Sequence, residues 1–272
     1  MKLLKLAVAT LMMLLLAETG YSSGESGGFQ PLPSVWSLIF GHEGPVYFFV
    51  DIVYSLATSI LFTITVVIVY RKRQMIPGKL QNFLELLVES AYNFIESILG
   101  NNAKKYTPFL GTLFFYILVN NMWGLIPGGH SPSTNINITA SMAIMVFIYS
   151  QYIGFTRLGI AKYFDHLMGE PRDFMGWMMV PLLLPIHIIT EIAKPFTLAV
   201  RLFGNITGED VLVAAFAGLG IGMLAFMHSP VGVPLNVPFI FLGILLSTIQ
   251  ALVFAMLSTI YFLLMLPHEE AH

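Results

Sequence analysis

A series of ionisable side chains lies inside a long apolar stretch that covers about residues 179–228. Its members are His187, Glu191, Lys194, Arg201, Glu209 and Asp210. A charge at the centre of a bilayer costs between about 2.5 and 17 kcal/mol, depending on the reference state, and such residues persist where they face a partner or a water-filled cavity. Arg201, in the middle of the stretch, is therefore predicted to be the working charge of an ion-translocating membrane subunit.

Helical geometry divides these polar groups into two regions. At about 100° per residue, one broad face carries Thr190, Lys194, Thr197, Arg201, Asn205 and Gly208. Asp210 lies on the opposite side of the helix from Arg201, whereas His187 and Glu191 lie close to the arginine face. We therefore expect one polar path on each side of Arg201. If the next apolar stretch folds back as a hairpin, Gln250 is expected to come level with Arg201 and to join the path.

Each of these residues also has a structural interpretation. Lys194 would extend its ammonium to the membrane surface, and His187 would be an ordinary interface residue. Glu209 and Asp210 would lie near the headgroups, and Asn205 would only bond to a neighbouring helix. For Arg201 the alternative is a structural salt bridge with a carboxylate on another helix.

Composition places the chain in the membrane. Of its 272 residues, 56% are hydrophobic and only 10% are charged, whereas soluble domains carry about 25% charged residues. The chain has no cysteine, so disulfides and thiolate metal sites are excluded. It also lacks the glycine-rich loop GxxxxGK[ST] of nucleotide-binding proteins and the zinc motif HExxH. We expect no cofactor, no metal, no catalytic site of its own and no nucleic-acid partner.

The apolar segments predict an all-α polytopic membrane protein. Spans are expected over about 51–70, 107–127, 138–157, 179–228 and 238–266, and the last two form a long tilted hairpin. In residues 77–100 apolar side chains recur at helical spacing, which predicts one amphipathic helix on the membrane surface. The fourth stretch is too long for one perpendicular span, so it tilts, lies partly in the membrane plane, or breaks at Gly204, Gly208 or 218–222.

The N-terminal region differs from the rest. Residues 1–20 resemble an export signal, with Lys2 and Lys5 before a short apolar run, although an uncleaved anchor or a surface helix has the same pattern. Residues 21–45 form an extracytoplasmic tail, and 46–272 form the membrane domain. Lysine and arginine are concentrated in the loops after the first and third spans, which predicts an outside N-terminus and a cytoplasmic C-terminus.

Several segments resemble subunit a of the bacterial F-type ATP synthase. They are AKPFTLAVRLFGNITGEDVLV (193–213), STIQALVFAMLSTIYF (247–262), PGKLQNFLELLVE (77–89), NNMWGLIP (120–127) and STNINITASMA (133–143). The resemblance covers nearly everything after about residue 45. It implies a multi-pass stator subunit of the bacterial inner membrane that provides two half-channels to a rotating c-ring. Its implied partners are the c-ring, the peripheral-stalk b subunits and the F1 sector, besides the lipid bilayer.

The resemblance also implies roles for individual residues. Arg201 matches the indispensable arginine of the family, which attracts the deprotonated ring carboxylate and blocks leakage between the half-channels. Asn205 and Gln250 match positions that line the path, and Asp210 matches an acidic position whose task Glu209 would share or replace. One departure is Gly243, where some relatives carry a histidine or glutamate that pairs with that acidic position. We expect protons rather than sodium ions to be carried, and ATP synthesis or hydrolysis to occur in other subunits.

Two other classes of protein were weighed. A secondary transporter in which Arg201 binds an anionic substrate predicts inverted repeats and paired broken helices, and the sequence has neither. An intramembrane hydrolase requires a nucleophile with its base, or a metal site such as HExxH, and the sequence shows neither.

Overall fold

A computed structural model describes residues 45–71, 78–126, 129–159, 162–163, 165, 168–169, 174–225 and 235–266. The predicted export signal (1–20), nearly all of the predicted tail, most of the turn between the last two spans, and the C-terminus lie outside these residues. In the described part of the chain every regular element is helical. The prediction of an all-α fold is confirmed.

Five segments are long and apolar enough to cross a membrane. They are Asp51–Val69, Gln81–Leu125, Ile136–Arg157, Met178–Gly220 and Val237–Leu264. The second segment comprises two helices, α4 (Lys79–Leu99) and α5 (Ala103–Leu125). The other four lie in α3 (Pro45–Arg71), α6 (Ile136–Arg157), α8 (Phe174–Ala225) and α9 (Val237–Leu264). The chain is therefore a multi-pass helical membrane protein, as predicted, although α3 and α8 begin earlier than expected.

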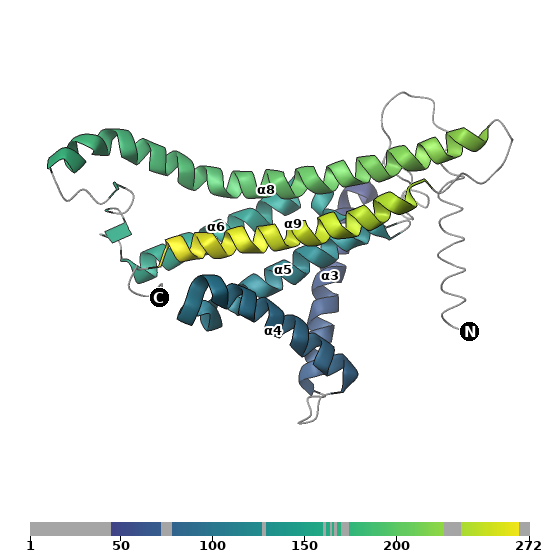
Figure 1. Cartoon of the computed structure of the whole chain (residues 1–272), viewed down its shortest axis with the longest axis horizontal. Coiled ribbons are helices and arrows are strands. Elements are labelled where there is room, and N and C mark those ends of the chain that lie inside the picture. Colours follow the sequence, from purple (N-terminus) through teal and green to yellow (C-terminus); the bar gives the residue numbers. More distant parts are fainter. Residues whose placement is uncertain are drawn as a thin grey trace. The chain divides into compact units, whose positions relative to one another are not determined.

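Helix α8 is continuous over 52 residues (Figure 1). At 1.5 Å per residue it is about 78 Å long, far more than the roughly 30 Å of hydrocarbon in a bilayer. It does not break at Gly204, Gly208 or 218–222, so that alternative from the sequence is wrong. Glycine in a membrane helix need not break it, because the backbone hydrogen bonds can continue through it. A strong tilt or a partly in-plane course of α8 stays a prediction.

Helix α4 is the helix that the sequence predicts to lie on the membrane surface. It ends at Gly100, whose φ of +55° is readily adopted only by glycine and turns the chain into the short 3-10 helix η2 (Gly100–Asn102). Near its end Ile95 and Leu99 are buried, whereas Phe83 and Leu86 near its start are exposed. The apolar residues of α4 recur at helical spacing, so an amphipathic helix is confirmed. Its position on the membrane stays a prediction.

The described residues form two compact units. Unit 1 contains α3 up to Thr65, Tyr116–Asn135, and Phe203–Gln250 from α8 and α9. Its helices are joined by buried polar contacts: Thr58 donates a hydrogen bond to Asn120 (2.8 Å) and accepts one from the Trp123 indole (2.9 Å). Phe216 of α8 stacks on Phe239 of α9, with ring centroids 3.7 Å apart. Unit 1 therefore holds α8 and α9 together near the turn that joins them.

Unit 2 contains Val66–Phe115, Ile136–Leu202 and the part of α9 after Gln250. Its core is aromatic. Phe262 of α9 packs against Tyr106 and Phe109 of α5 and Tyr149 of α6, with centroid separations of 5.6, 5.9 and 5.1 Å. Edge-to-face and stacked arrangements of this kind add specificity to packing that apolar burial alone leaves loose.

Candidate functional site

Arg201 lies on an exposed face of α8. Thr197, Arg201, Gly204, Asn205 and Gly208 are all exposed along this face. A Cβ atom added at Gly204 or Gly208 would meet nothing within 4 Å. Among the described residues no ion pair includes Arg201, so this part of the chain offers no support for an internal structural salt bridge. The face therefore presents one guanidinium beside two positions where another helix can approach closely.

Asn205, one helical turn after Arg201, contacts Gln250 of α9. The Asn205 amide nitrogen donates a hydrogen bond to the Gln250 side-chain oxygen. Gln250 is buried, and its own amide nitrogen has no hydrogen-bond partner in the described part of the chain. Gln250 therefore contacts α8 one helical turn after Arg201, and its place in a path level with Arg201 stays a prediction.

Glu209 occupies a buried place between α8 and α9. Ser247 lies within hydrogen-bond distance of both its carboxylate oxygens, at 3.3 and 3.5 Å. A Cβ atom at Gly243 would lie 2.3 Å from one of these oxygens and 2.6 Å from a methyl carbon of Leu125. The missing side chain at Gly243 thus leaves the space that the Glu209 carboxylate fills.

A second polar cluster in unit 1 involves residues far apart in the sequence. His130 Nε2 lies 2.8 Å from a carboxylate oxygen of Asp51, and the Asn135 amide donates to the other oxygen at 2.7 Å. His130 also lies within electrostatic range of Asp210. The Asp210 carboxylate is close to Gly124 as well, since a Cβ atom there would be 3.3 Å from it. Asp51, His130 and Asn135 therefore form one cluster. The chain next to His130 approaches Asp210 at Gly124, because a Cβ atom added there would also be 3.0 Å from the Cβ atom of Ser131.

Unit 1 also contains buried polar atoms that lack hydrogen-bond partners among the described residues. They include side-chain atoms of Asn120, Asn121, Ser133, Thr207 and Gln250. Leaving a buried amide or hydroxyl unpaired costs about 1–3 kcal/mol. Apart from the Tyr106 hydroxyl, which belongs to unit 2, every atom of this set lies in unit 1. Polar groups of this kind are stable where water reaches them.

Unit 2 holds a different network, in which the polar groups are paired. Glu191 of α8 forms an ion pair with Lys194 and accepts a hydrogen bond from Gln151 of α6 at 2.9 Å. The Tyr163 hydroxyl donates to the Gln151 side-chain oxygen. Burial raises the pKa of Tyr163, and the charge of Glu191 raises that pKa further. The Tyr163 hydroxyl therefore keeps its proton and remains a donor.

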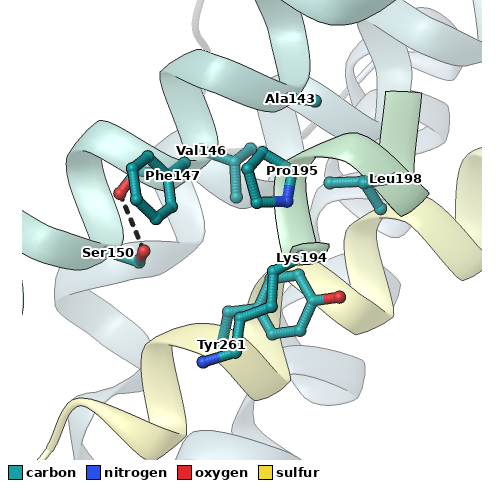
Figure 2. Close-up of a pocket in the computed structure, with 8 residues that line it drawn as sticks. All are labelled: Ala143, Val146, Phe147, Ser150, Lys194, Pro195, Leu198 and Tyr261. Carbon is teal, nitrogen blue, oxygen red and sulfur yellow. Dashed lines mark hydrogen bonds between the residues drawn. The ribbon is translucent and has the colours of Figure 1, made fainter. Parts of the chain in front are cut away.

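Figure 2 shows the hollow beside this network. Its lining residues come from α6, α8 and α9: Ala143, Val146, Phe147, Ser150, Lys194, Pro195, Leu198 and Tyr261. The Lys194 ammonium lies 5.5 Å from the centre of the Tyr261 ring. The structural interpretation of Lys194 requires its ammonium to extend to the membrane surface. In the structure the ammonium instead contacts Glu191 and the Tyr261 ring.

His187 is half-buried near the start of α8, and a Cβ atom at Gly169 would lie 3.8 Å from its ring. It belongs to unit 2 with Glu191, one turn before it. The predicted site residues thus fall into two groups. Unit 1 holds Asn205, Glu209, Asp210 and Gln250, whereas unit 2 holds His187, Glu191 and Arg201.

The sequence analysis missed four polar residues that the structure adds to these groups: Asp51, His130, Gln151 and Tyr163. Asp51 and Gln151 are polar residues within predicted spans, which is itself a signal of function in a membrane. His130 was assigned only to a polar turn. Among the described residues no cluster of three or more histidine, aspartate or glutamate side chains could hold a metal ion.

The fold and site define a polytopic helical membrane protein with ionisable groups inside its spanning segments. The comparisons with known proteins narrow this class. Residues 52–263 match the family model described as "ATP synthase A chain". This chain belongs to that family.

Curated relatives agree over most of their length. A protein of Protochlamydia amoebophila named "ATP synthase subunit a" is 42% identical over 220 residues, which are 81% of each chain. A protein of the same name from Oleidesulfovibrio alaskensis is 41% identical, over 75% of this chain and 79% of its own. Another from Nitratidesulfovibrio vulgaris is 36% identical, over 87% of this chain and 96% of its own. The resemblance drawn from the sequence motifs is confirmed.

Proposed function

We propose that this chain is the proton-translocating stator subunit of the membrane sector of an ATP synthase. Family membership makes it a component of that complex. The observation that carries the finer proposal is the exposed face of α8, where Arg201 stands beside Gly204 and Gly208 with open space in front of both glycines. A ring of c subunits, each with a membrane-embedded carboxylate, provides a partner for an otherwise costly charge.

Arg201 is proposed to separate two half-channels. It attracts the deprotonated carboxylate of the passing c subunit and blocks the direct passage of protons. A membrane potential of 100 mV supplies about 2.3 kcal/mol per proton. Several protons must therefore be moved for each ATP, and any leak past Arg201 would dissipate the gradient.

The outer half-channel is assigned to the polar groups of unit 1. Glu209 and Asp210 supply carboxylates, and Asn205 and Gln250 supply amides. The buried unpaired polar atoms of the same unit favour this assignment, because they need water and a proton path supplies it. The inner half-channel is assigned to unit 2, where Glu191 and His187 are the ionisable groups nearest the start of α8.

Orientation and partners complete the proposal. The subunit lies in a bacterial inner membrane with its N-terminus outside and its C-terminus in the cytoplasm, since lysine and arginine follow the first and third spans. Besides the c-ring, it contacts peripheral-stalk b subunits and acts with the F1 sector, which carries the nucleotide chemistry. Protons rather than sodium ions are the cargo.

Cysteine cross-linking tests the assignment of the α8 face. The natural sequence has no cysteine, so single substitutions introduce a unique thiol. Gly208→Cys is expected to form a disulfide with a cysteine placed on the outer helix of the c-ring, in the assembled enzyme. Ile148→Cys, on another exposed position in α6, serves as the control and is expected to give no such product. A well-assembled enzyme in which only Ile148→Cys reacted with the ring would contradict the proposal.

A further inference from the structure

The site around Asp51 and His130 is not explained by the residues that the motifs pick out. We propose that His130 is the outer proton relay of this chain and that Asp51 and Asn135 hold it in position to exchange protons with Asp210. The proposal rests on the proposed function above. It assigns a proton-transfer role to a residue outside every apolar span, in the segment between α5 and α6.

The first argument is the absence of room on α9. A histidine or carboxylate at Gly243 could reach Asp210 only if Glu209 and Leu125 moved, because even a Cβ atom there would be 2.3 Å from Glu209 and 2.6 Å from Leu125. Glu209 is itself buried and engaged with Ser247. A partner for Asp210 must therefore come from another part of unit 1.

The second argument is the construction of the His130 site. Asp51 comes from α3, and Asn135 follows the 3-10 helix η3 (Pro132–Thr134). Their contacts of 2.8 Å and 2.7 Å use both oxygens of one carboxylate, so Asp51 ties the segment 130–135 to α3. His130 and Asp51 are only 21% and 15% exposed, which is enough for contact with water and too little for free rotation.

The third argument is the set of ionisable groups around the imidazole. In the described part of the chain these include Asp51 from α3 and Asp210 from α8, and Glu209 adjoins Asp210 in the sequence. The neighbouring parts of α5 and α9 contribute polar but uncharged groups, including Asn120 and Ser247. Histidine changes its charge near physiological pH and can pass protons between water and a carboxylate.

The transfer needs no other reagent. A proton from the extracytoplasmic water adds to the neutral His130 ring and forms an imidazolium opposite Asp51. The imidazolium then gives a proton to the Asp210 carboxylate and returns to the neutral ring. Asp210 passes that proton on toward the ring carboxylate, and the sequence reverses during ATP-driven pumping.

The test uses the complete ATP synthase in inverted membrane vesicles, with ATP-driven acidification as the measurement. His130→Gln is expected to lower the initial pumping rate by about tenfold, less than a full acid–base contribution because Glu209 and water still accept protons. In His130→Ala, added imidazole is expected to restore part of the rate, which a purely structural role would not allow. Asp51→Asn should slow pumping, because the carboxylate that positions the His130 ring is lost, and Asp51→Glu should restore part of the rate.

Two controls separate the possible outcomes. Ser59→Ala, on the exposed side of α3, changes only a bond to its own helix (3.1 Å) and is expected to pump normally. Arg201→Ala is measured in the same vesicles. Loss of pumping in Arg201→Ala with an unchanged rate in His130→Gln would overturn this inference alone, whereas normal pumping in Arg201→Ala would overturn the proposed function itself. Slow pumping in His130→Ala that imidazole does not improve would also reject the relay.

Discussion

The Glu209 carboxylate lies in the space that a side chain at Gly243 would occupy, with one oxygen 2.3 Å from the position of the missing Cβ atom. The two residues come from α8 and α9, and Ser247, one turn further along α9, holds the same carboxylate. The lack of a side chain at Gly243 is therefore matched by an acidic residue that α8 inserts from the other side.

This relationship predicts the effect of Gly243→Ala. Alanine is favoured over glycine in a helix by about 1 kcal/mol, which offsets part of the cost of crowding Leu125, 2.6 Å from the new Cβ atom. The added methyl group must displace Glu209 from Ser247, and we expect ATP-driven pumping to slow several-fold. Gly111→Ala in α5 is the matched control, because a Cβ atom there meets nothing within 4 Å. Equal pumping by the two variants would show that the position of Glu209 does not matter.

The Asn205–Gln250 pair predicts a coupled effect. Asn205→Leu and Gln250→Leu should each slow pumping by about fivefold, equivalent to about 1 kcal/mol of activation free energy. Because each substitution removes the same hydrogen bond, the double variant should be no slower than the slower single variant. Initial pumping rates at matched enzyme content measure the cycle. Fully multiplicative losses would mean that the two amides act independently.

The Glu191–Lys194 pair predicts a loss of stability. Lys194→Met leaves the Glu191 carboxylate without its cation at a site where both side chains are only about one-sixth exposed. Removing one partner of a fully buried pair costs about 3–5 kcal/mol, and partial exposure should reduce this to about 2 kcal/mol. We expect less subunit in isolated membranes by immunoblot.

The double variant Lys194→Met with Glu191→Gln should recover much of that amount, since no unpaired charge remains. If Lys194→Met alone accumulated to the normal level, the ion pair would have no structural role. The pumping rate of the double variant, corrected for its amount, then reports separately on Glu191 as an inner proton carrier.

Much of the fold could be predicted from the sequence because the bilayer requires apolar segments of a set length. The span predicted over 138–157 corresponds to α6 at Ile136–Arg157. The helical spacing of apolar residues after Lys79 predicted α4. The continuity of α8 could not be predicted from the sequence. Glycines such as Gly204 and Gly208 occur both where a helix breaks and where a continuous helix lets a partner approach closely.

The candidate site residues that the sequence identified lie on α8 and, for Gln250, on α9. Arg201, Asn205 and Asp210 stand out because each is polar in an apolar stretch, and helical spacing places them on faces. Contacts between segments need the packing register. The hydrogen bond from Asn205 to Gln250 joins residues of two different helices. His130 and Asp51 are 79 positions apart in the sequence, so nothing local connects them.

Arg201→Ala tests the central claim most directly. The measurement is ATP-driven acidification of inverted vesicles that contain the assembled enzyme, together with the passive proton leak through the membrane sector after removal of F1. Arg201 is exposed on α8, so the variant should assemble, and we expect pumping to be abolished while passive leak persists or rises. Pumping at the normal rate in the assembled Arg201→Ala enzyme would contradict the account.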